Sequence, residues 1–300
     1  MRVAVTGATG FLGSHLVAGL LARGHEPVGV VREPARGAHL GIPLRRADLA
    51  DPDALREAFT GLDAVVANAA PSVVTEAGRD IAPFVRAEQQ AAANVVESAL
   101  AAGVPRLVHI SSVAVYRVRR PNAVVGPDHP RRAPGDRWDL VHLVTRRGYP
   151  ESKAAAEQVV WDAVARGLRP TVLRPGPVYG SRDAKLTARY LRAAAARWRL
   201  VPTVRLPHVH AGDVARAVAG ALENPASEGR AYNVTGDSVS LLDVARAVRQ
   251  QTGSRTCLLP VPVPLWLACD DATTERDLGV QYRSLAEGVR ECVAPGFVDV

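Results

Sequence analysis

Short apolar runs alternate along the chain with longer stretches that are apolar on one side only. The runs at residues 2–5, 28–31, 64–67, 107–110 and 171–173 have the length and composition of buried strands. Residues 11–20, 80–102 and 149–160 follow a period of about 3.6 residues and predict helices. Strands that alternate with helices in this way are joined by parallel crossovers. The pattern therefore predicts an α/β protein with a doubly wound parallel sheet.

Glycine marks the end of three of the predicted helical segments. Gly24, Gly103 and Gly167 each follow an apolar-faced segment, and each has a proline nearby and a predicted strand after it. A glycine just past a helix accepts the left-handed cap conformation, and proline prevents the helix from restarting. The repeated unit supports the same doubly wound architecture.

The first predicted strand ends in a turn that contains Gly7, Gly10 and Gly13, and a helix follows at once. Glycines allow the backbone to approach an anion closely, and the unpaired amides at a helix start carry a partial positive charge. A strand, a glycine turn and a helix in this order predict a dinucleotide-binding site rather than an ordinary turn.

Composition and charge narrow the classes of partner. The 300 residues are 47% hydrophobic with a net charge of +7, and they allow one large domain or two interleaved ones. The basic residues are spread along the chain without an RNA-binding signature, so we expect no nucleic-acid partner. No apolar run reaches the roughly 18 residues of a membrane helix, and we expect no membrane association. Three widely spaced cysteines and the absence of a leader pattern favour a cytoplasmic protein with reduced thiols.

The end of the second strand indicates which dinucleotide is bound. An acidic residue that bonds the ribose 2′-hydroxyl of NAD is common there, but this chain has Arg32. A guanidinium group suits a 2′-phosphate, so the sequence favours NADP over NAD. Glu33 is the alternative, because NAD would be preferred if this carboxylate faced the ribose.

Three residues form a candidate catalytic centre. Tyr149 and Lys153 lie four apart at the start of a predicted helix and therefore share a face. A free tyrosine titrates near pH ~10, and a neighbouring ammonium group favours the phenolate and lowers that pKa. Ser112, just after the strand at 107–110, can hydrogen-bond the reacting oxygen. Lysine occurs only at positions 153 and 185 among 37 basic residues, so a lysine here indicates a need for an ammonium group.

These segments together resemble the extended short-chain dehydrogenase/reductase superfamily, which contains nucleotide-sugar epimerases, dehydratases and ketoreductases. The glycine turn Thr-Gly-Ala-Thr-Gly-Phe-Leu-Gly, the Ser-Ser-Val-Ala-Val-Tyr at 111–116 and the Tyr-Pro-Glu-Ser-Lys at 149–153 are similar to its motifs. The segments at 174–180, 208–215, 231–234 and 275–279 extend the likeness over essentially the whole chain.

The resemblance implies a Rossmann-like sheet with a smaller, discontinuous C-terminal substrate-binding domain. Residues 1–176 and 207–235 would form the dinucleotide-binding domain, and residues 177–206 and 236–300 the substrate-binding domain. It also implies a homodimer formed through the helices at 80–102 and 149–166.

The same resemblance assigns the site residues. Tyr149, Lys153 and Ser112 would be catalytic, with Ser111 less suited. Ser112, Tyr149 and Arg205 would contact the substrate, Arg205 through a diphosphate, and no metal is expected. The implied cofactor contacts are Gly7, Thr9, Gly10, Phe11, Leu12, Gly13, Arg32, Asp48, Leu49, Ala67, Asn68, Ala69, Tyr149, Lys153, Pro175 and Val178.

The implied activity is NADP(H)-dependent reduction of a carbonyl in a nucleotide-linked 4-keto sugar or a related small molecule. A nucleotide-sugar epimerase that oxidises transiently with tightly bound NAD(P) is the first alternative, and a non-catalytic dinucleotide sensor is the second. Val113 and Ala114 replace the acidic pair with which sugar dehydratases expel water, so dehydration is disfavoured.

The sequence does not determine the role of three other features. Glu88 stands where the family's helix motif usually has asparagine. Residues 117–148 are rich in proline and arginine, without a helical or strand period, and Arg131, Arg132 and Arg137 are candidate substrate contacts. Residues 186–200 form a helix-like run rich in arginine.

Overall fold

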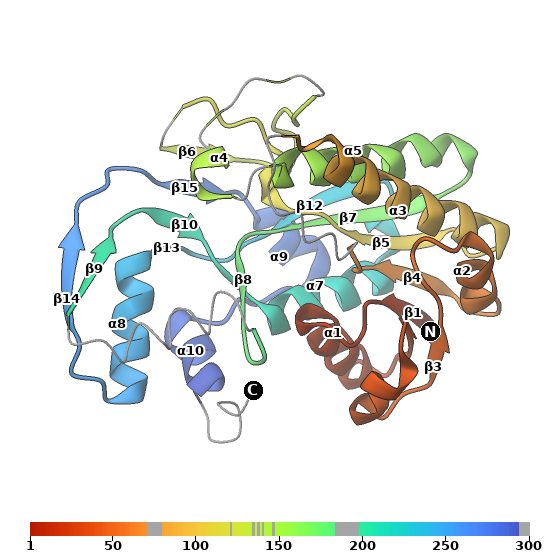
Figure 1. Ribbon diagram of the computed structural model, residues 1–300, viewed down its shortest axis with the longest axis horizontal. Coiled ribbons are helices and arrows are strands. Elements are labelled where there is room, and N and C mark those ends of the chain that lie inside the picture. The colour runs from red at the N-terminus through yellow and green to blue at the C-terminus, as the bar shows by residue number, and fades with distance from the viewer. Residues whose placement is uncertain are drawn as a thin grey trace.

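The computed structural model describes residues 1–70, 80–120, 122–133, 136, 139, 141–145, 148–183 and 198–293. Within these residues, seven parallel strands form a central sheet in the order β12-β7-β5-β4-β1-β2-β3 (Figure 1). They are β1 (Arg2–Thr6), β2 (Glu26–Val31), β3 (Leu44–Arg46), β4 (Ala64–Ala67), β5 (Arg106–Ile110), β7 (Arg169–Pro175) and β12 (Arg230–Val234). Strand order runs outward from β1 in both directions, which confirms the doubly wound, Rossmann-like sheet.

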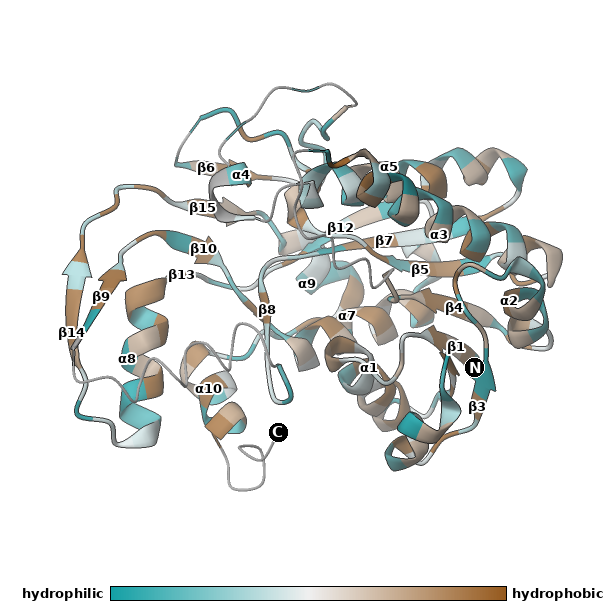
Figure 2. Cartoon of the chain, viewed as in Figure 1, coloured by the Kyte–Doolittle hydropathy of each residue, from teal (hydrophilic) through white to brown (hydrophobic). Residues whose placement is uncertain are grey.

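Helices cover both faces of this sheet. On one face lie α1 (Phe11–Ala22) and α7 (Ala211–Glu223), and on the other lie α2 (Pro52–Phe59), α3 (Ala82–Ala101) and α5 (Tyr149–Asp162) (Figure 1). Successive side chains of a strand point to opposite faces, so Val3 and Val5 pack with α1 and α7 while Ala4 packs with α2 and α3. Figure 2 shows the resulting concentration of hydrophobic residues along β1 and β4.

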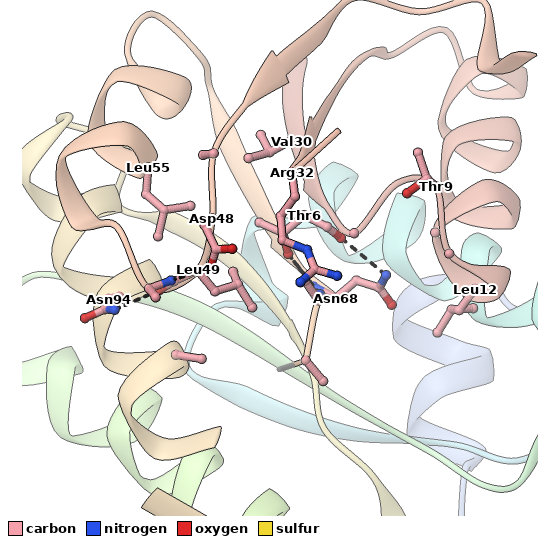
Figure 3. A pocket seen from close by; sticks show the side chains of 18 of the residues that line it. Thr6, Thr9, Leu12, Val30, Arg32, Asp48, Leu49, Leu55, Asn68 and Asn94 are labelled. Atoms are coloured by element: carbon pink, nitrogen blue, oxygen red, sulfur yellow. Dashed lines mark hydrogen bonds between the residues drawn. The ribbon is translucent and has the colours of Figure 1, made fainter. Parts of the chain in front are cut away.

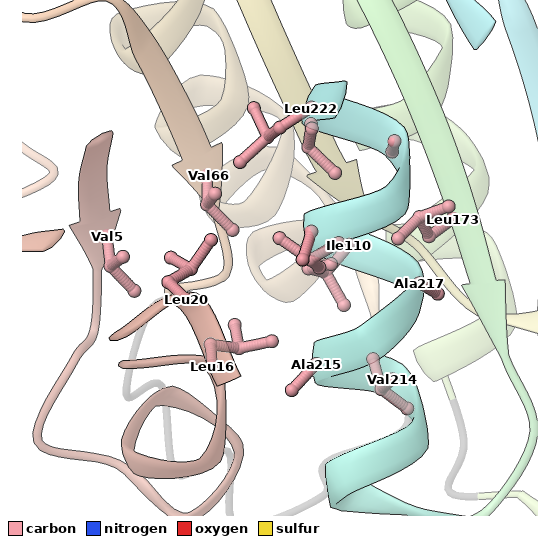
Figure 4. Packing of buried hydrophobic residues seen from close by; sticks show 14 of the residues in the cluster. Val5, Leu16, Leu20, Val66, Ile110, Leu173, Val214, Ala215, Ala217 and Leu222 are labelled. Carbon is pink, nitrogen blue, oxygen red and sulfur yellow. The ribbon is translucent and has the colours of Figure 1, made fainter. Parts of the chain in front are cut away.

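Small side chains bring α1 and α7 close together. A Cβ atom on Gly19 would lie 2.7 Å from Cβ of Ala215, so only glycine fits at this crossing. Figure 4 shows Leu16 and Leu20 of α1 packed between α7 and the strand residues of the same cluster. The packing fixes α1, and with it the glycine turn that precedes this helix.

Four two-stranded sheets lie beside the central one. They pair β8 (Val178–Tyr179) with β11 (Val209–His210), β10 (Arg205–Pro207) with β13 (Ser238–Ser240), β9 (Trp198–Pro202) with β14 (Cys257–Val261), and β6 (Ala123–Val125) with β15 (Leu267–Cys269). The helices of this region are α8 (Leu241–Thr252), α9 (Ala272–Leu278) and α10 (Leu285–Val293), and α4 (Val141–Val144) lies near β6. Short 3₁₀ helices are η1 (Pro34–Leu40), η2 (Val113–Val115), η3 (Ala163–Arg166) and η4 (Pro225–Ser227). The division into domains at 177–206 and 236–300 stays a prediction.

The structure differs from the sequence expectations in three places. Residues 117–148 contain β6 and α4, which are too short to show a period, and β6 is fixed by its parallel pairing with β15. Residues 198–200, expected as the end of a helix-like run, belong to strand β9, because they pair with β14. The remainder of that run lies outside the described residues. The expectations also omitted β3 and α2, although Asp51 caps α2 and Pro52 begins it, which are ordinary helix-start signals.

The three glycines predicted to end helical segments have the expected left-handed backbone. Their φ angles are +75° at Gly24, +72° at Gly103 and +95° at Gly167. Among the helices described, none has the length and apolar character needed to cross a membrane.

Candidate active site

The turn between β1 and α1 leaves no room for side chains. Gly7 has a φ of +66°, and a Cβ atom on Gly13 would lie 2.1 Å from the Gly7 carbonyl oxygen. Helix α1 begins directly afterwards, without a side-chain cap at Gly10. Because Gly10 has no side chain, no capping oxygen at this position accepts from the first amides of α1. Helices that bind phosphate at their N-terminus commonly begin in this way.

A cavity of about 730 Å³ opens beside this turn, at the carboxyl ends of β1, β2 and β4. Its volume is that of a site for a large ligand. Figure 3 shows side chains that line it, and eleven of the predicted cofactor contacts are among its lining residues: Gly7, Thr9, Gly10, Phe11, Leu12, Gly13, Arg32, Asp48, Leu49, Asn68 and Ala69. The space and the glycine turn together fit a dinucleotide.

Thr6 joins the glycine turn to the loop that follows β4. Its hydroxyl oxygen accepts hydrogen bonds from the backbone amides of Asn68 and Ala69, each at 3.0 Å. The Asn68 side chain donates in return to the Thr6 carbonyl at 3.3 Å (Figure 3). Three contacts thus hold the two loops at a fixed separation on either side of the cavity. Sequence reasoning did not assign Thr6 this role.

Helix α3 supplies a wall of the cavity that the sequence analysis missed. Asn94 donates to the Leu49 carbonyl at 2.7 Å and accepts from the Gln90 side chain at 2.9 Å. These amides hold the Asp48–Leu49 loop against the helix. A polar side chain on the buried face of an amphipathic helix is the signal that would have identified Asn94.

The side chains of Arg32 and Glu33, just after β2, have different surroundings. Arg32 lines the cavity (Figure 3), whereas the Glu33 side chain is 65% exposed and lies 3.9 Å from the Arg36 guanidinium. The cavity therefore presents a cation at this edge, and Glu33 is directed to Arg36.

Ser112 and its neighbour Ser111 have different partners. The Ser111 hydroxyl donates to Glu157 at 2.6 Å, whereas the Ser112 oxygen accepts from the Ala114 amide at 3.2 Å and begins η2. The residues of η2 pack in one apolar cluster with Tyr149 of α5. Ser112 therefore lies at the point where β5 meets the start of α5.

Helix α5 begins from a constrained glycine. Gly148 has a φ of +79°, and a Cβ atom there would lie 3.0 Å from Cβ of Ile81. Its carbonyl accepts from the Ser152 amide at 2.9 Å and so belongs to the first turn. Tyr149 is half-buried in that turn, and Lys153 follows one turn later on the same face.

Lys153 lines a second, much smaller cavity that adjoins the first. This space of about 20 Å³ is also lined by Glu88, His109 and Ala67, and it shares Ala69 and Ala91 with the large cavity. Burial, together with the positive charge of Lys153, lowers the pKa of His109 to about 4. Lys153 is therefore next to the cavity that fits the dinucleotide. Pro175 and Val178, also predicted cofactor contacts, are the last residue of β7 and the first of β8.

Glu157 joins α5 to β5 and β7. Its carboxylate accepts from Arg174 at 2.6 and 3.1 Å and from the Ser111 hydroxyl and the Trp161 ring nitrogen. Burial alone would raise the pKa of Glu157, but these hydrogen bonds and the Arg174 charge lower it to about 2. The network fixes the serine loop against the helix that carries Tyr149 and Lys153.

The arginines proposed for substrate contacts have protein partners. Arg132 is buried, and its Nη2 donates to both carboxylate oxygens of Asp139 at 2.9 Å. Arg131 lies 3.2 Å from Glu157. Arg205 donates to the Ser238 carbonyl and lies 3.6 Å from Asp243. Arg137 lies outside the described residues.

Comparison with known proteins identifies the family. Residues 3–235 match the NAD dependent epimerase/dehydratase family. The chain belongs to this family. The family resemblance expected from the motifs is therefore confirmed.

Two curated relatives are reductases. The chain is 33% identical over 204 residues to the 2-alkyl-3-oxoalkanoate reductase of Stenotrophomonas maltophilia, a match that covers 67% of this chain and 58% of the relative. It is 32% identical over 206 residues to the 4-hydroxy-2-methyl-3-oxo-4-farnesyl-3,4-dihydroquinoline-1-oxide ketoreductase of Stigmatella aurantiaca, covering 66% of this chain and 57% of that one. The chain thus spans less than two thirds of the length of these relatives.

A solved UDP-glucose-4-epimerase from Stenotrophomonas maltophila, with bound NAD and formylated UDP-arabinopyranose, has the same fold. Its TM-score is 0.83 at 22% identity, and the match covers 97% of this chain and 96% of that one. The agreement supports the Rossmann-like fold over the whole chain.

Proposed function

We propose that the protein is an NADP(H)-dependent reductase of a ketone in a small molecule. The observation that carries this proposal is that the large cavity and the small one beside Lys153 are neighbours, since Ala69 and Ala91 line both. A dinucleotide bound along the glycine turn would extend toward the residues expected to handle a proton.

Each catalytic residue has one task in this reaction. The bound dinucleotide supplies the hydride that reduces the carbonyl carbon. Tyr149 donates a proton to the carbonyl oxygen, and Ser112 holds that oxygen by a hydrogen bond. Lys153 places a positive charge beside the tyrosine that becomes a phenolate. The product is an alcohol.

The named relatives and the position of Arg205 favour a ketone without an attached nucleotide. The two curated relatives are named as reductases of an oxoalkanoate and of an oxo-dihydroquinoline oxide. Arg205, proposed for a diphosphate, already contacts Ser238 and Asp243. A nucleotide-linked 4-keto sugar is the second substrate class, because the solved epimerase binds a UDP sugar.

The test is NADPH consumption with two substrate probes, a 3-oxoalkanoate ester and a UDP-linked 4-keto sugar. We expect one NADPH to be consumed for each alcohol formed from the ester. Turnover of the UDP sugar without net loss of NADPH would instead identify an epimerase.

Tyr149→Phe separates a catalyst from a sensor. Removing the phenol should lower kcat at least about 100-fold while the dinucleotide still binds, because proton transfer in the transition state is worth about that much. If the unmodified protein binds NADPH but turns over neither probe, the result favours a non-catalytic dinucleotide sensor over a reductase.

We also propose a cytoplasmic homodimer formed through α3 and α5. Sedimentation equilibrium would give twice the chain mass, and a single-chain mass would exclude the dimer.

A further inference from the structure

A buried carboxylate lies beside Lys153. Oε2 of Glu88, on α3, is 3.7 Å from Nζ of Lys153, on α5. The two side chains are only 7% and 12% exposed, so water screens their interaction poorly. Both line the small cavity that adjoins the dinucleotide site. Their charges therefore interact directly, one helical turn from Tyr149 on α5.

The other titratable groups around Lys153 do not compensate its charge in the same way. On β5, His109 is neutral above pH ~4, because burial and the Lys153 charge lower its pKa to about 4. On α5, Glu157 is paired with Arg174. Tyr149, one helical turn before Lys153, is the group on which the lysine acts in the proposed reaction. The loop after β4 contributes the alanines 67 and 69. In the described part of the chain, Glu88 is thus the acid placed to offset the lysine.

The offset changes what Lys153 does to Tyr149. An ammonium group favours the phenolate, and a carboxylate close to that ammonium group reduces the effect. We propose that Glu88 tunes the catalytic tyrosine by countering Lys153, so that the ammonium group favours the phenolate less strongly and Tyr149 serves as a proton donor for reduction. Glu88 is a positioning and tuning residue here, since it acts through Lys153. The inference rests on the proposed reductase function.

The first test is the pH dependence of kcat/KM for ketone reduction in Glu88→Gln. Loss of the carboxylate strengthens the field of Lys153. The tyrosine should then lose its proton at lower pH, and the rate of reduction should fall at that lower pH as well. We expect the alkaline limb of the profile to move down by about one pH unit. Glu88→Asp, which keeps the charge, should restore most of the shift.

A matched control comes from the same helix. Glu97→Gln also removes one carboxylate from α3, but this residue is half exposed and pairs with Arg166. Its profile should coincide with that of the unmodified protein. A shift of equal size in Glu97→Gln would mean that overall charge, not the contact with Lys153, moves the profile, and would overturn the proposal.

A second readout needs neither cofactor nor turnover. Phenolate absorbance can be titrated in the free protein, and subtraction of the Tyr149→Phe titration isolates Tyr149. Burial raises the pKa of the other described tyrosines, which are Tyr116, Tyr179, Tyr232 and Tyr282, so they contribute little near neutrality. The isolated midpoint should fall by the same amount in Glu88→Gln as the limb of the rate profile.

The outcomes separate the two proposals. An unchanged tyrosine midpoint in Glu88→Gln overturns the tuning role, even if the variant is less stable. A lowered midpoint in a protein that reduces no ketone leaves the tuning role standing and rejects the reductase. If Glu88→Gln does not fold, Glu88→Asn provides the same charge change, with asparagine being the residue usual at this position in the family.

Discussion

Arg32 is the residue through which the structure bears most directly on cofactor choice. It lines the dinucleotide cavity, while Glu33 is turned outward to Arg36. A guanidinium and a phosphate form a charge-assisted pair worth about 1.5–3 kcal/mol, which is about one to two decades of affinity. We therefore predict that NADPH binds more tightly than NADH and that Arg32→Ala weakens NADPH binding about 10- to 100-fold with little effect on NADH.

Fluorescence titration of both reduced dinucleotides measures this difference. Arg166→Ala is the control, because Arg166 is exposed, pairs with Glu97 and does not line the cavity. Arg36 is unsuitable, because it lies in η1, shortly after Arg32, and could share the phosphate. NADH binding as tight as NADPH binding in the unmodified protein would contradict the Arg32 argument and leave the fold intact.

Single residues also show what the sequence could not supply. The strand ends, the glycine turn, Tyr149 and Lys153 were identifiable because their spacing along the chain carries the information. Thr6 is hydrogen-bonded to Asn68 across 62 positions of the chain, and Asn94 to Leu49 across 45. No local pattern encodes the partner in such a contact, although a polar residue on the buried face of a predicted helix marks Asn94 itself as a candidate.

Among the elements, the position of the first turn of α5 depends on the glycine that precedes it. Gly148 combines a left-handed backbone with close contact to Ile81, so Gly148→Ala introduces both strain and a clash in the turn that carries Tyr149. We predict a loss of about 1–3 kcal/mol of unfolding free energy and a fall in kcat, because the first turn must move.

Gly167→Ala is the matched control for that prediction. Gly167 follows η3, beyond the far end of α5, and has a φ of +95° with no atom near the added Cβ. Chemical denaturation should show a comparable loss of stability, while kcat stays near that of the unmodified protein. Equal losses of kcat in both variants would mean that the first turn of α5 has no special part in positioning Tyr149.

The Glu157 contacts that connect α5 to β5 and β7 should make the free energy of unfolding fall at acid pH. Glu157 has a pKa of about 2 in the folded protein against an ordinary value of 4.5. A depressed folded pKa adds stability above the unfolded value, and this contribution disappears as pH falls from about 4.5 toward 2. We predict a loss of the order of 2–3 kcal/mol over this window from Glu157.

Urea denaturation between pH 7 and pH 3 tests the origin of that loss. Glu157→Gln should be less stable at pH 7, because Arg174 is left buried without its carboxylate, and should show a shallower decline with acid. A decline as steep as that of the unmodified protein would assign the acid sensitivity to other carboxylates.

Element prediction succeeded where an element has a clear hydrophobic pattern of its own and failed where distant pairing defines it. Strands β1, β2, β4, β5 and β7 are largely apolar runs bounded by turn residues, and helices α1, α3 and α5 are long enough to show a helical period. Strands β6 and β9 exist because of distant partners, β15 and β14, so their sequences alone have too few residues to reveal them. Local propensity decides little in a short strand that lacks an extended apolar run.

At the scale of the whole molecule, the parallel sheet assembles the site. The carboxyl ends of β1, β2, β4 and β5 lead into the glycine turn, Arg32, Asn68 and Ser112. The residues predicted to bind phosphate and to take part in proton transfer therefore lie along one edge of the sheet. The parts of the site that lie along this edge follow from strand order. Most strands of the small sheets lie in the segments predicted to bind substrate, and the sequence pattern did not predict how these strands pair.

Because the dinucleotide cavity contacts β1, β2, β4 and α3 together, binding should stabilise the fold as a unit. A ligand that binds only the folded state adds about 2.7 kcal/mol at 100 times its Kd. For a chain of this size each kcal/mol raises Tm by about 2–4 °C, so saturating NADPH should raise Tm by several degrees. At equal concentration NADH should raise it less, and Arg32→Ala should remove the difference between the two. Differential scanning fluorimetry measures all three, and equal shifts from both dinucleotides in the unmodified protein would contradict a 2′-phosphate contact by Arg32.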